Sequence, residues 1–233
     1  MGPSVRTLSQ PRQPSAERCQ KVYFYVVDRD FGFAPNPFHG SCTLATCKPK
    51  IRARARIGDW VIGMGGARLN ATGCCLFAMH VSQTRSFNEY WSDPDYFDKR
   101  PVRNGSSRMV VGDNVYHRDP TTNEWHQADS HHSNSDGTVN THNLNKDTKT
   151  DRILISSNFF YFGALAPAVP QMILDRMGYR NCRDYRVFEQ SSCMEFLTWL
   201  HERFGRQRNL VLADPFDFAE SFKRYSARDN KIR

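Results

Sequence analysis

Two short apolar segments in the first third of the chain constrain the fold more than any other feature. Residues 22–27 are apolar or aromatic on both faces of an extended chain, which is typical of a central strand covered on both sides. Residues 58–63, GDWVIG, indicate a second buried strand entered from a turn. A segment rich in Gly, Pro and Asn follows the first of them. We therefore expect two strands that bracket a long, shaped loop.

The loop ends in five cations within nine residues, directly before the second predicted strand. Ile51, Ala53 and Ala55 alternate with arginines as in a strand, but Ala and Arg also favour helices, and Pro49 suits a first helical turn. We favour a short helix. Both interpretations keep the cations together and predict a phosphate-binding surface made of Lys48, Lys50, Arg52, Arg54 and Arg56.

The charge balance and the aromatic content set the broad class. The 233 residues include 32 Lys and Arg against 24 Asp and Glu, a formal net charge of +8. This excess suits an anionic partner such as DNA or a nucleotide, although solubility alone would also explain it. The 16 Phe, 9 Tyr and 4 Trp supply buried area for one core. We predict a single domain over residues 21–225, a disordered tail over residues 1–20 and a frayed basic tail over residues 226–233.

The cysteines and the apolar runs indicate the cellular compartment in which the protein is expected. Seven cysteines without a CxxC spacing favour reduced, buried thiols over disulfides or a zinc site. No apolar run approaches the ~18 residues of a membrane helix, and the first residues lack the apolar core of a signal peptide. We therefore predict a cytoplasmic protein without membrane contact. The sequence identifies no cofactor and leaves the oligomeric state open.

Aromatic and polar residues are interleaved between residues 85 and 105. Such a segment can stack a flipped or single-stranded base, because every base presents a π face. A lid packed on the sheet would show the same pattern. Together with the turn-rich loop and the second strand, the segment predicts a base-binding set of Asn36, His39, Trp60, Tyr90 and Trp91.

The polar centre of the chain holds four of its eight histidines within sixteen residues. Histidine titrates near neutral pH and a neighbouring carboxylate fixes its tautomer, so an acid–base set is a candidate here: Asp113, His117, Asp129 and His131. A metal could bind His117, Asp129, His131 and His132, but their spacing matches no defined ligand pattern. A solvated loop is the alternative. Residues 133–150 are almost purely polar and predict a pocket wall or a plain loop.

The second half of the chain shows clearer periodicity. Residues 152–163 predict one strand, and residues 170–178 predict a helix that begins after a proline and ends at a glycine. Ser192 and Glu195 have the spacing of a capping box, and the apolar residues that follow predict an amphipathic core helix as far as Gly205.

Several separated motifs resemble one known family. They are NPFHGSCTLATCKPKIR at residues 36–52, IGDWVIGMGG at 57–66, YWSDP at 90–94, GDNVYH at 112–117 and NFFYFG at 158–163. In this order they resemble the nucleotide modification associated domain 2 family of phages and bacteria, over roughly residues 20–225. The resemblance implies a role around modified DNA bases or nucleotides, in phage DNA hypermodification or in the opposing bacterial phage defence.

A more distant likeness is to the PUA-like base-binding domains (EVE, YTH and ASCH). It depends on the order of a Gly-Asp-Trp-Val strand, an apolar strand over residues 75–81 and an acidic, aromatic Asp-Pro segment. Short strands and a few helices indicate an α+β class, and the likeness implies a small PUA-like β-barrel or half-barrel with peripheral helices.

These observations lead to two main functional hypotheses, both of which place the cationic run and the histidine-rich middle around one cleft. The leading one is a protein that binds a modified nucleobase or nucleotide, where stacking of ~1–3 kcal/mol per base offsets the cost of extruding it. The alternative is an enzyme that acts on a nucleobase or nucleotide through the Asp- and His-rich segment. A purely structural or partner-binding role is a third hypothesis.

Overall fold

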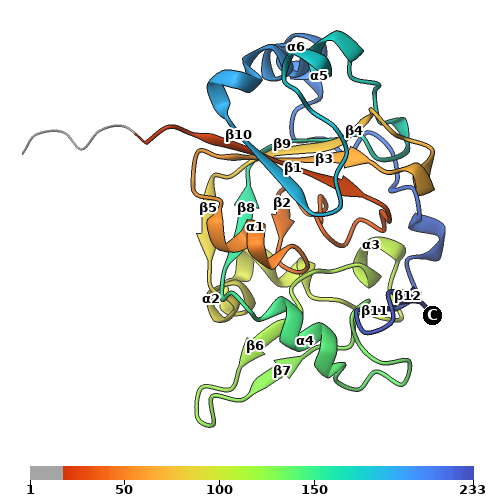
Figure 1. The fold of residues 1–233 in the computed structure, drawn as a ribbon. Helices are drawn as coiled ribbons and strands as arrows, with labels where there is room; N and C mark the ends of the chain where they lie inside the picture. The colour runs from red at the N-terminus through yellow and green to blue at the C-terminus, as the bar shows by residue number, and fades with distance from the viewer. Residues whose placement is uncertain (1–17) are drawn as a thin grey trace, which may run out of the picture.

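The computed structural model describes residues 18–233, so the predicted tail over residues 1–20 lies almost wholly outside the described residues. A five-stranded sheet crosses the middle of the molecule (Figure 1). Its strand order is β10 (Tyr185–Glu189), β1 (Lys21–Val27), β3 (Trp60–Gly65), β4 (Cys75–His80) and β9 (Asn158–Tyr161). Only β1 and β3 run parallel; the other pairs are antiparallel.

The strand predicted over residues 22–27 is confirmed, the one predicted over residues 58–63 lies two residues later at Trp60–Gly65, and the two are neighbours in the sheet. Val22 pairs with Trp60 and Val27 with Gly65. Parallel neighbours require a crossover connection, which explains the length of the segment between them. That crossover carries β2 (Cys42–Leu44) and α1 (Pro49–Arg54), so the short helix that we favoured for the cationic run is present.

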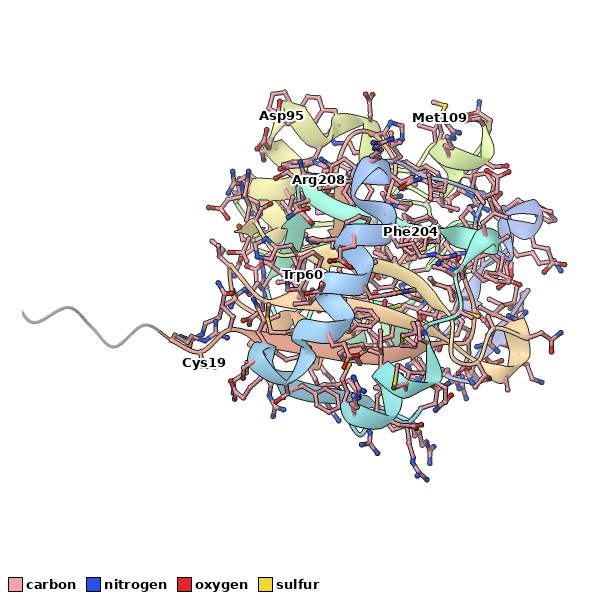
Figure 2. All side chains as sticks on the ribbon, turned by 90° about the horizontal axis from the view of Figure 1, so that it is seen from above. Cys19, Trp60, Asp95, Met109, Phe204 and Arg208 are labelled. Atoms are coloured by element: carbon pink, nitrogen blue, oxygen red, sulfur yellow. The ribbon has the colours of Figure 1, made fainter. Side chains whose placement is uncertain are left out.

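Both faces of the central sheet are covered, as the apolar composition of β1 predicted. On one face Val22 and Phe24 pack in a core with α5 (Gln171–Arg176) and α6 (Met194–Phe204), the two helices above the sheet in Figure 1. On the other face Tyr23 and Tyr25 pack in a second core with β2 and α1. The view from above shows α6 lying across the strands (Figure 2).

A second, three-stranded sheet lies below the first in Figure 1, in the order β2, β8 (Ile153–Ser156) and β5 (Gln83–Arg85). The single strand predicted over residues 152–163 is wrong in one respect, because it breaks at Ser157 into β8 and β9, which belong to different sheets. Two hairpins complete the strands: β6 (Tyr116–Arg118) with β7 (Trp125–Gln127), and β11 (Tyr225–Ser226) with β12 (Lys231–Ile232).

Short helices surround these sheets. The remaining α-helices are α2 (Phe87–Ser92), α3 (Ser107–Val110) and α4 (Thr141–Asp147). The 3₁₀ turns are η1 (Ala67–Leu69), η2 (Pro94–Lys99), η3 (Gly163–Leu165), η4 (Gln190–Cys193), η5 (Gly205–Gln207) and η6 (Phe218–Glu220). None of the helices in the described range has the length and apolar content needed to cross a bilayer.

The core helix expected before Gly205 is present, but its predicted capping box is wrong. The turn η4 runs directly into α6, so Cys193 is the N-cap residue and no side chain caps the helix. A capping box does begin α2, where the Ser86 hydroxyl accepts from the Glu89 amide and the Glu89 carboxylate accepts from the Ser86 amide.

The polar segment over residues 133–150 is not a plain loop, because it contains α4. Asn140 caps this helix by accepting from the Asn143 amide. Asn143 and Asp147 lie on the buried side of the helix, where their side chains bind neighbouring loops. Polar contacts therefore replace the apolar stripe that normally signals a helix in a sequence.

The fold is α+β, as predicted, but no sheet closes into a barrel within residues 18–233. The likeness to PUA-like domains therefore stays a prediction. Residues 226–233, expected to fray, lie in the β11–β12 hairpin. Arg224 and Arg233 exchange two backbone hydrogen bonds of 2.8 Å, and the Arg29 guanidinium donates to the Asn230 carbonyl at 3.0 Å. The hairpin is thus held against the end of β1.

Candidate functional site

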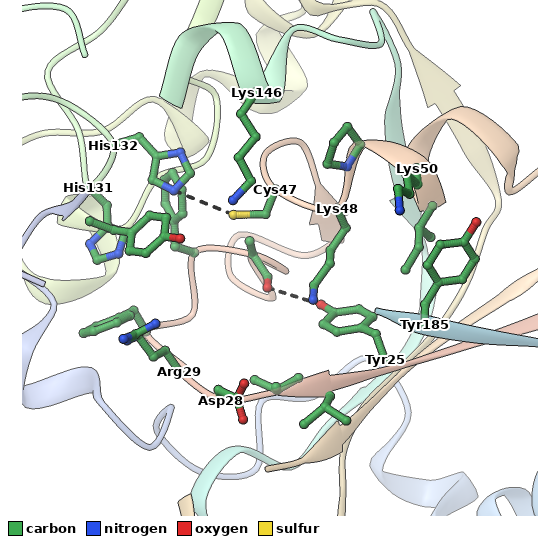
Figure 3. A pocket seen from close by; sticks show the side chains of 18 of the residues that line it. Tyr25, Asp28, Arg29, Cys47, Lys48, Lys50, His131, His132, Lys146 and Tyr185 are labelled. Carbon is green, nitrogen blue, oxygen red and sulfur yellow. Dashed lines mark hydrogen bonds between the residues drawn. The ribbon is translucent and has the colours of Figure 1, made fainter. Parts of the chain in front are cut away.

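A cavity of about 560 Å³ opens between the end of β1 and the crossover that carries α1. Segments far apart in the sequence line it: residues 25–34 after and within β1, residues 47–51 at the start of α1, the pair His131–His132, the end of α4, and the β11–β12 hairpin. Figure 3 shows Cys47, Lys48 and Lys146 facing its centre, with His132 beside Cys47. Lys48 is the first residue of the cationic run, Cys47 directly precedes it, and His132 belongs to the histidine-rich middle.

Cys47 occupies an unusual turn between β2 and α1. Cys47 and Lys48 both have left-handed backbones, with φ of 55° and 38°, which residues other than glycine rarely adopt. The Cys47 amide donates to Asp147 Oδ1 at 2.8 Å, which fixes this turn to the end of α4. The turn places the thiol on the cavity wall at the beginning of the helix.

His132 links the thiol to the same carboxylate. Its Nδ1 lies 2.7 Å from Asp147 Oδ2, and its Nε2 lies 3.7 Å from Cys47 Sγ. Both His132 and Asp147 are buried, and the Tyr116 hydroxyl donates to Asp147 Oδ2 at 3.0 Å. An ionised carboxylate only accepts hydrogen bonds, so Nδ1 carries a proton and Nε2 faces the thiol. This is the arrangement of a nucleophile, a general base and an orienting carboxylate.

The charges of the three groups support one another. Burial disfavours their charged forms, but the Asp147 carboxylate and the Cys47 sulfur raise the pKa of His132 to about 9. Burial also opposes a thiolate, yet the adjacent His132 imidazolium lowers the pKa of Cys47 below its usual range. The same imidazolium outweighs burial at Asp147 and lowers the pKa of that carboxyl. All three pKa shifts are in the direction of a thiolate–imidazolium pair, the reactive form of a cysteine nucleophile.

Arg52 holds the turn and α4 together from beneath. Its side chain is fully buried and donates to the carbonyls of Cys47 at 2.9 Å and Arg152 at 2.8 Å, and also to that of Asp147. We predicted Arg52 to bind phosphate, but it has no path to the cavity because four backbone carbonyls occupy its donors. The reason is that one turn of helix directs alternate cations of the run to opposite sides.

Three lysines make the cavity electropositive. Lys48 Nζ lies 4.2 Å from the centre of the Tyr25 ring, Lys146 Nζ lies 5.4 Å from the centre of the Tyr225 ring, and Lys149 is exposed at the edge. None of the three forms an ion pair with a carboxylate within residues 18–233, whereas Lys50 pairs with Asp184. Unpaired ammonium groups beside aromatic rings suit a ligand that carries both a phosphate and a planar base.

His131 lines the cavity as a neutral ring. Its Nδ1 lies 2.6 Å from the Lys223 carbonyl, which can only accept, so Nδ1 carries the proton. Burial and then the positive charge of His132 lower the pKa of His131 to about 3. The rings of Phe31 and Phe33 lie 4.6 and 5.1 Å from it. We predicted that His131 acts in acid–base chemistry. The histidine that contacts both Asp147 and Cys47 is instead His132.

Three other predicted residues meet in a closed polar network away from the cavity. Asp113 accepts from the Thr43 hydroxyl at 2.7 Å and from the Tyr90 hydroxyl at 2.8 Å. Lys99 donates to Asn36 Oδ1 at 2.9 Å. All five residues are fully buried. Burial raises the pKa of Asp113 to about 6 and lowers that of Lys99 to about 8. Asn36, Tyr90 and Asp113 therefore stabilise the fold and do not face a ligand cavity.

Trp60, Trp91 and His117 lie away from the main cavity. Trp60 packs in the core against His80 and His201, on the α6 side of the sheet. Trp91 and His117 stack on each other, with ring centres 4.1 Å apart, and neither lines the main cavity.

Four further candidates are exposed. His39 and Arg56 line no part of the main cavity, Arg54 donates to the Tyr185 hydroxyl, and Asp129 pairs with Arg224. Of the predicted set, the structure thus brings Lys48, Lys50 and His131 together.

The sequence reasoning missed Cys47 and Asp147 and named His132 only as a metal ligand. The residue separations explain this, since His132 lies 85 positions from Cys47 and 15 from Asp147. A signal was present in the Thr-Cys-Lys-Pro step, which puts a cysteine directly before a predicted helix start.

The three groups also have the residue types of a metal site, with ligand atoms within 4.8 Å of one another. Asp147 and Cys47, however, face opposite nitrogens of the His132 ring. A metal at the cavity wall would therefore have Cys47 Sγ and His132 Nε2 as ligands, with Asp147 behind them. The direct hydrogen-bonded chain fits an acid–base–nucleophile set better than a three-ligand metal centre.

Comparison with known proteins gives one family. A family model described as nucleotide modification associated domain 2 matches residues 19–222. A search among curated proteins and a search among solved structures found no match. The matched range contains Cys47, His132 and Asp147, and it ends before β11.

Iodoacetamide should alkylate Cys47 faster than any other cysteine at pH 6, because its lowered pKa leaves more thiolate there. The exposed Cys19 is an internal control, since a hydrogen bond from its thiol to Glu189 raises its pKa. Peptide mass spectrometry would follow each site. The His132→Ala variant should lose roughly tenfold in rate for each unit by which the pKa of Cys47 rises, whereas substitution of the exposed His126 in β7 by alanine should change nothing. Equal labelling of Cys47 and Cys19 would contradict the thiolate–imidazolium pair.

The Asp113→Ala variant should unfold more easily by about 1–3 kcal/mol, because it leaves the buried Tyr90 and Thr43 hydroxyls without their acceptor. Urea denaturation would measure this loss, with Asp98→Ala as the exposed control. If the folded Asp113→Ala protein kept its stability but lost a ligand, the assignment of Asp113 to the fold would be incorrect.

Proposed function

Because this chain belongs to the nucleotide modification associated domain 2 family, we propose that it is an enzyme that acts on a nucleotide through the Cys47 thiolate. The observation that carries the proposal is the Cys47–His132–Asp147 chain on the wall of a cavity with unpaired lysines. A pocket that only binds a base has no need for a buried imidazolium next to a thiol. Strongly shifted pKa values in a cavity are typical of reacting groups.

The cavity supports nucleotide binding in two ways. Tyr25, Tyr185 and Tyr225 supply ring faces and hydroxyls along the wall, which suits a heteroaromatic base. Lys48, Lys146 and Lys149 supply charge for a phosphate. A volume of about 560 Å³ falls within the ~300–1,000 Å³ usual for small-molecule sites.

The arrangement suits acyl transfer at an acyl group that a nucleotide base carries or receives. The Cys47 thiolate attacks the carbonyl carbon and forms a C–S bond. The bond from that carbon to the leaving amine or alcohol breaks, and the leaving group takes the proton from His132 Nε2. Water or an amine then attacks the thioester and gives its proton to His132, which frees the thiolate. Figure 3 shows the Lys146 ammonium beside Cys47, where it would stabilise the oxyanion of each tetrahedral intermediate.

A second candidate function is recognition of a modified base without chemistry. The specific observation in its favour is the number of aromatic side chains at the cavity, since Phe31 and Phe33 join the three tyrosines. In this function Lys48 and Lys146 would hold phosphate, and Cys47 would contact the modification. The two candidates share the cavity and differ only in whether Cys47 forms a covalent bond.

The Cys47→Ala variant separates the two candidates. We expect wild-type protein incubated with N4-acetyl-dCMP or N6-acetyl-dAMP to release the deacetylated nucleotide and to show an acetyl adduct on Cys47 by intact mass spectrometry. Cys47→Ala should lower the rate by roughly 10³-fold or more while nucleotide binding persists.

Cys74→Ala is the matched control, because Cys74 is also half-buried but lies outside the cavity. The same nucleotides would be titrated calorimetrically against both variants. Binding that is unchanged in every variant, with no mass change on any nucleotide or on Cys47, would leave recognition as the function and remove the covalent step.

A further inference from the structure

The β11–β12 hairpin separates the candidate site from a second cavity of about 500 Å³. Tyr225 borders both cavities. Ile232 faces the first one, and Arg224, Arg228 and Arg233 face the second. The two cavities are therefore adjacent, with a single ordered hairpin as their common wall.

The second cavity differs from the first in chemistry. Apart from Tyr225 and Val139, its wall is polar, with side-chain donors from Asn134, Asn140 and His142 and from the three arginines. Its lining residues include no cysteine, and their rings are those of Tyr225 and His142. It therefore offers mainly hydrogen bonds and positive charge, with fewer rings than the first cavity.

Carboxylates balance part of the positive charge. Arg224 pairs with Asp129, and Arg233 pairs with Asp229. Asp136 lines the cavity, but its carboxylate accepts from the amide and the hydroxyl of Thr138. Arg228 is exposed and has no ion-pair partner in the part of the chain that the structure describes. Its guanidinium is free to bind an oxyanion at the cavity edge.

The position of Tyr225 between the cavities is fixed by the same loops that build the candidate site. Its amide donates to the His131 carbonyl at 2.7 Å, and its carbonyl accepts from the Asn143 side chain at 2.6 Å. Its ring lies near two cations, Arg29 and Lys146. Tyr225 is thus an anchored residue that borders both cavities.

We propose that the nucleotide enters the candidate site as part of a single-stranded polynucleotide, with the adjoining phosphodiester backbone in the second cavity. The inference rests on the proposed function of the first cavity and specifies its substrate class. It follows from the different walls of the two cavities. The aromatic rings of the first suit the face of a base, and the donors and arginines of the second suit a phosphodiester backbone. Enzymes that act on a base take it from a single strand or extrude it from a duplex. Tyr225 lies where it would separate the reacting base from its neighbour.

Fluorescence anisotropy with single strands of about twelve nucleotides tests the proposal, with DNA, RNA and duplex DNA of one sequence as separate arms. We expect a single strand to bind more tightly than dCMP, which would be measured by competition. The Arg228→Ala variant should weaken strand binding and reduce the slope of log K against log salt by about 0.7, while the affinity for dCMP stays unchanged. Lys149→Ala, in the first cavity, should weaken both ligands.

Arg208→Ala is the matched control, because Arg208 is an exposed arginine shortly after α6 (Figure 2) and lines neither cavity. Equal affinity for dCMP and for the strand, or equal effects of Arg228→Ala and Arg208→Ala, would overturn the proposal. Duplex binding as tight as single-strand binding would also overturn it. The DNA and RNA arms identify the sugar that the site accepts.

Failure of the proposed function has a different signature. If a strand binds through Arg228 but neither reacts at Cys47 nor protects Cys47 from iodoacetamide, no nucleotide occupies the first cavity. That outcome would refute the proposed function. Protection of Cys47 by dCMP together with no added affinity for a strand would keep the proposed function and refute the polynucleotide substrate.

Discussion

The buried Asp147 carboxylate is the interaction on which the candidate site depends. One oxygen accepts from the Cys47 amide, and the other accepts from His132 and from Tyr116. These contacts join the turn before α1, the loop before α4 and the β6–β7 hairpin, which belong to three separate parts of the chain. A charge without solvent requires such partners, because an unpaired buried carboxylate would cost several kcal/mol. The carboxylate therefore fixes the nucleophile and its base in one geometry.

The central sheet gives this arrangement a rigid support. The parallel pair of β1 and β3 forces a crossover below the sheet, and that crossover brings Cys47 under the end of β1. The Arg52 side chain then joins α1 to the turn at Cys47 and to the chain before β8, because it donates to the carbonyls of Cys47 and Arg152. The strained turn at Cys47 and Lys48 is thus held by the sheet above and by the arginine below.

Two buried polar clusters in the molecule have different consequences. Asp113 accepts from Tyr90, and Lys99 donates to Asn36. These residues line neither cavity, so the shifted pKa values of Asp113 and Lys99 reflect the burial of a structural network. The pKa values of Cys47, His132 and Asp147 shift the other way, toward the charged forms, and Cys47 faces a cavity with unpaired lysines. Access to a ligand, and not the size of a shift, distinguishes a reacting group from a structural one.

The sequence by itself determined the two strands of the first third of the chain, the α+β class and the family, and it favoured the short helix of the cationic run, because apolar periodicity and local motifs depend on near neighbours. It also placed Lys48 and His131 at a shared site. Only the tertiary structure decided which polar groups meet. Arg52 and Asp113 carry the same residue types as reacting groups, yet packing buries them away from the cavity. Cys47, His132 and Asp147 come together through long-range contacts that local sequence patterns do not encode.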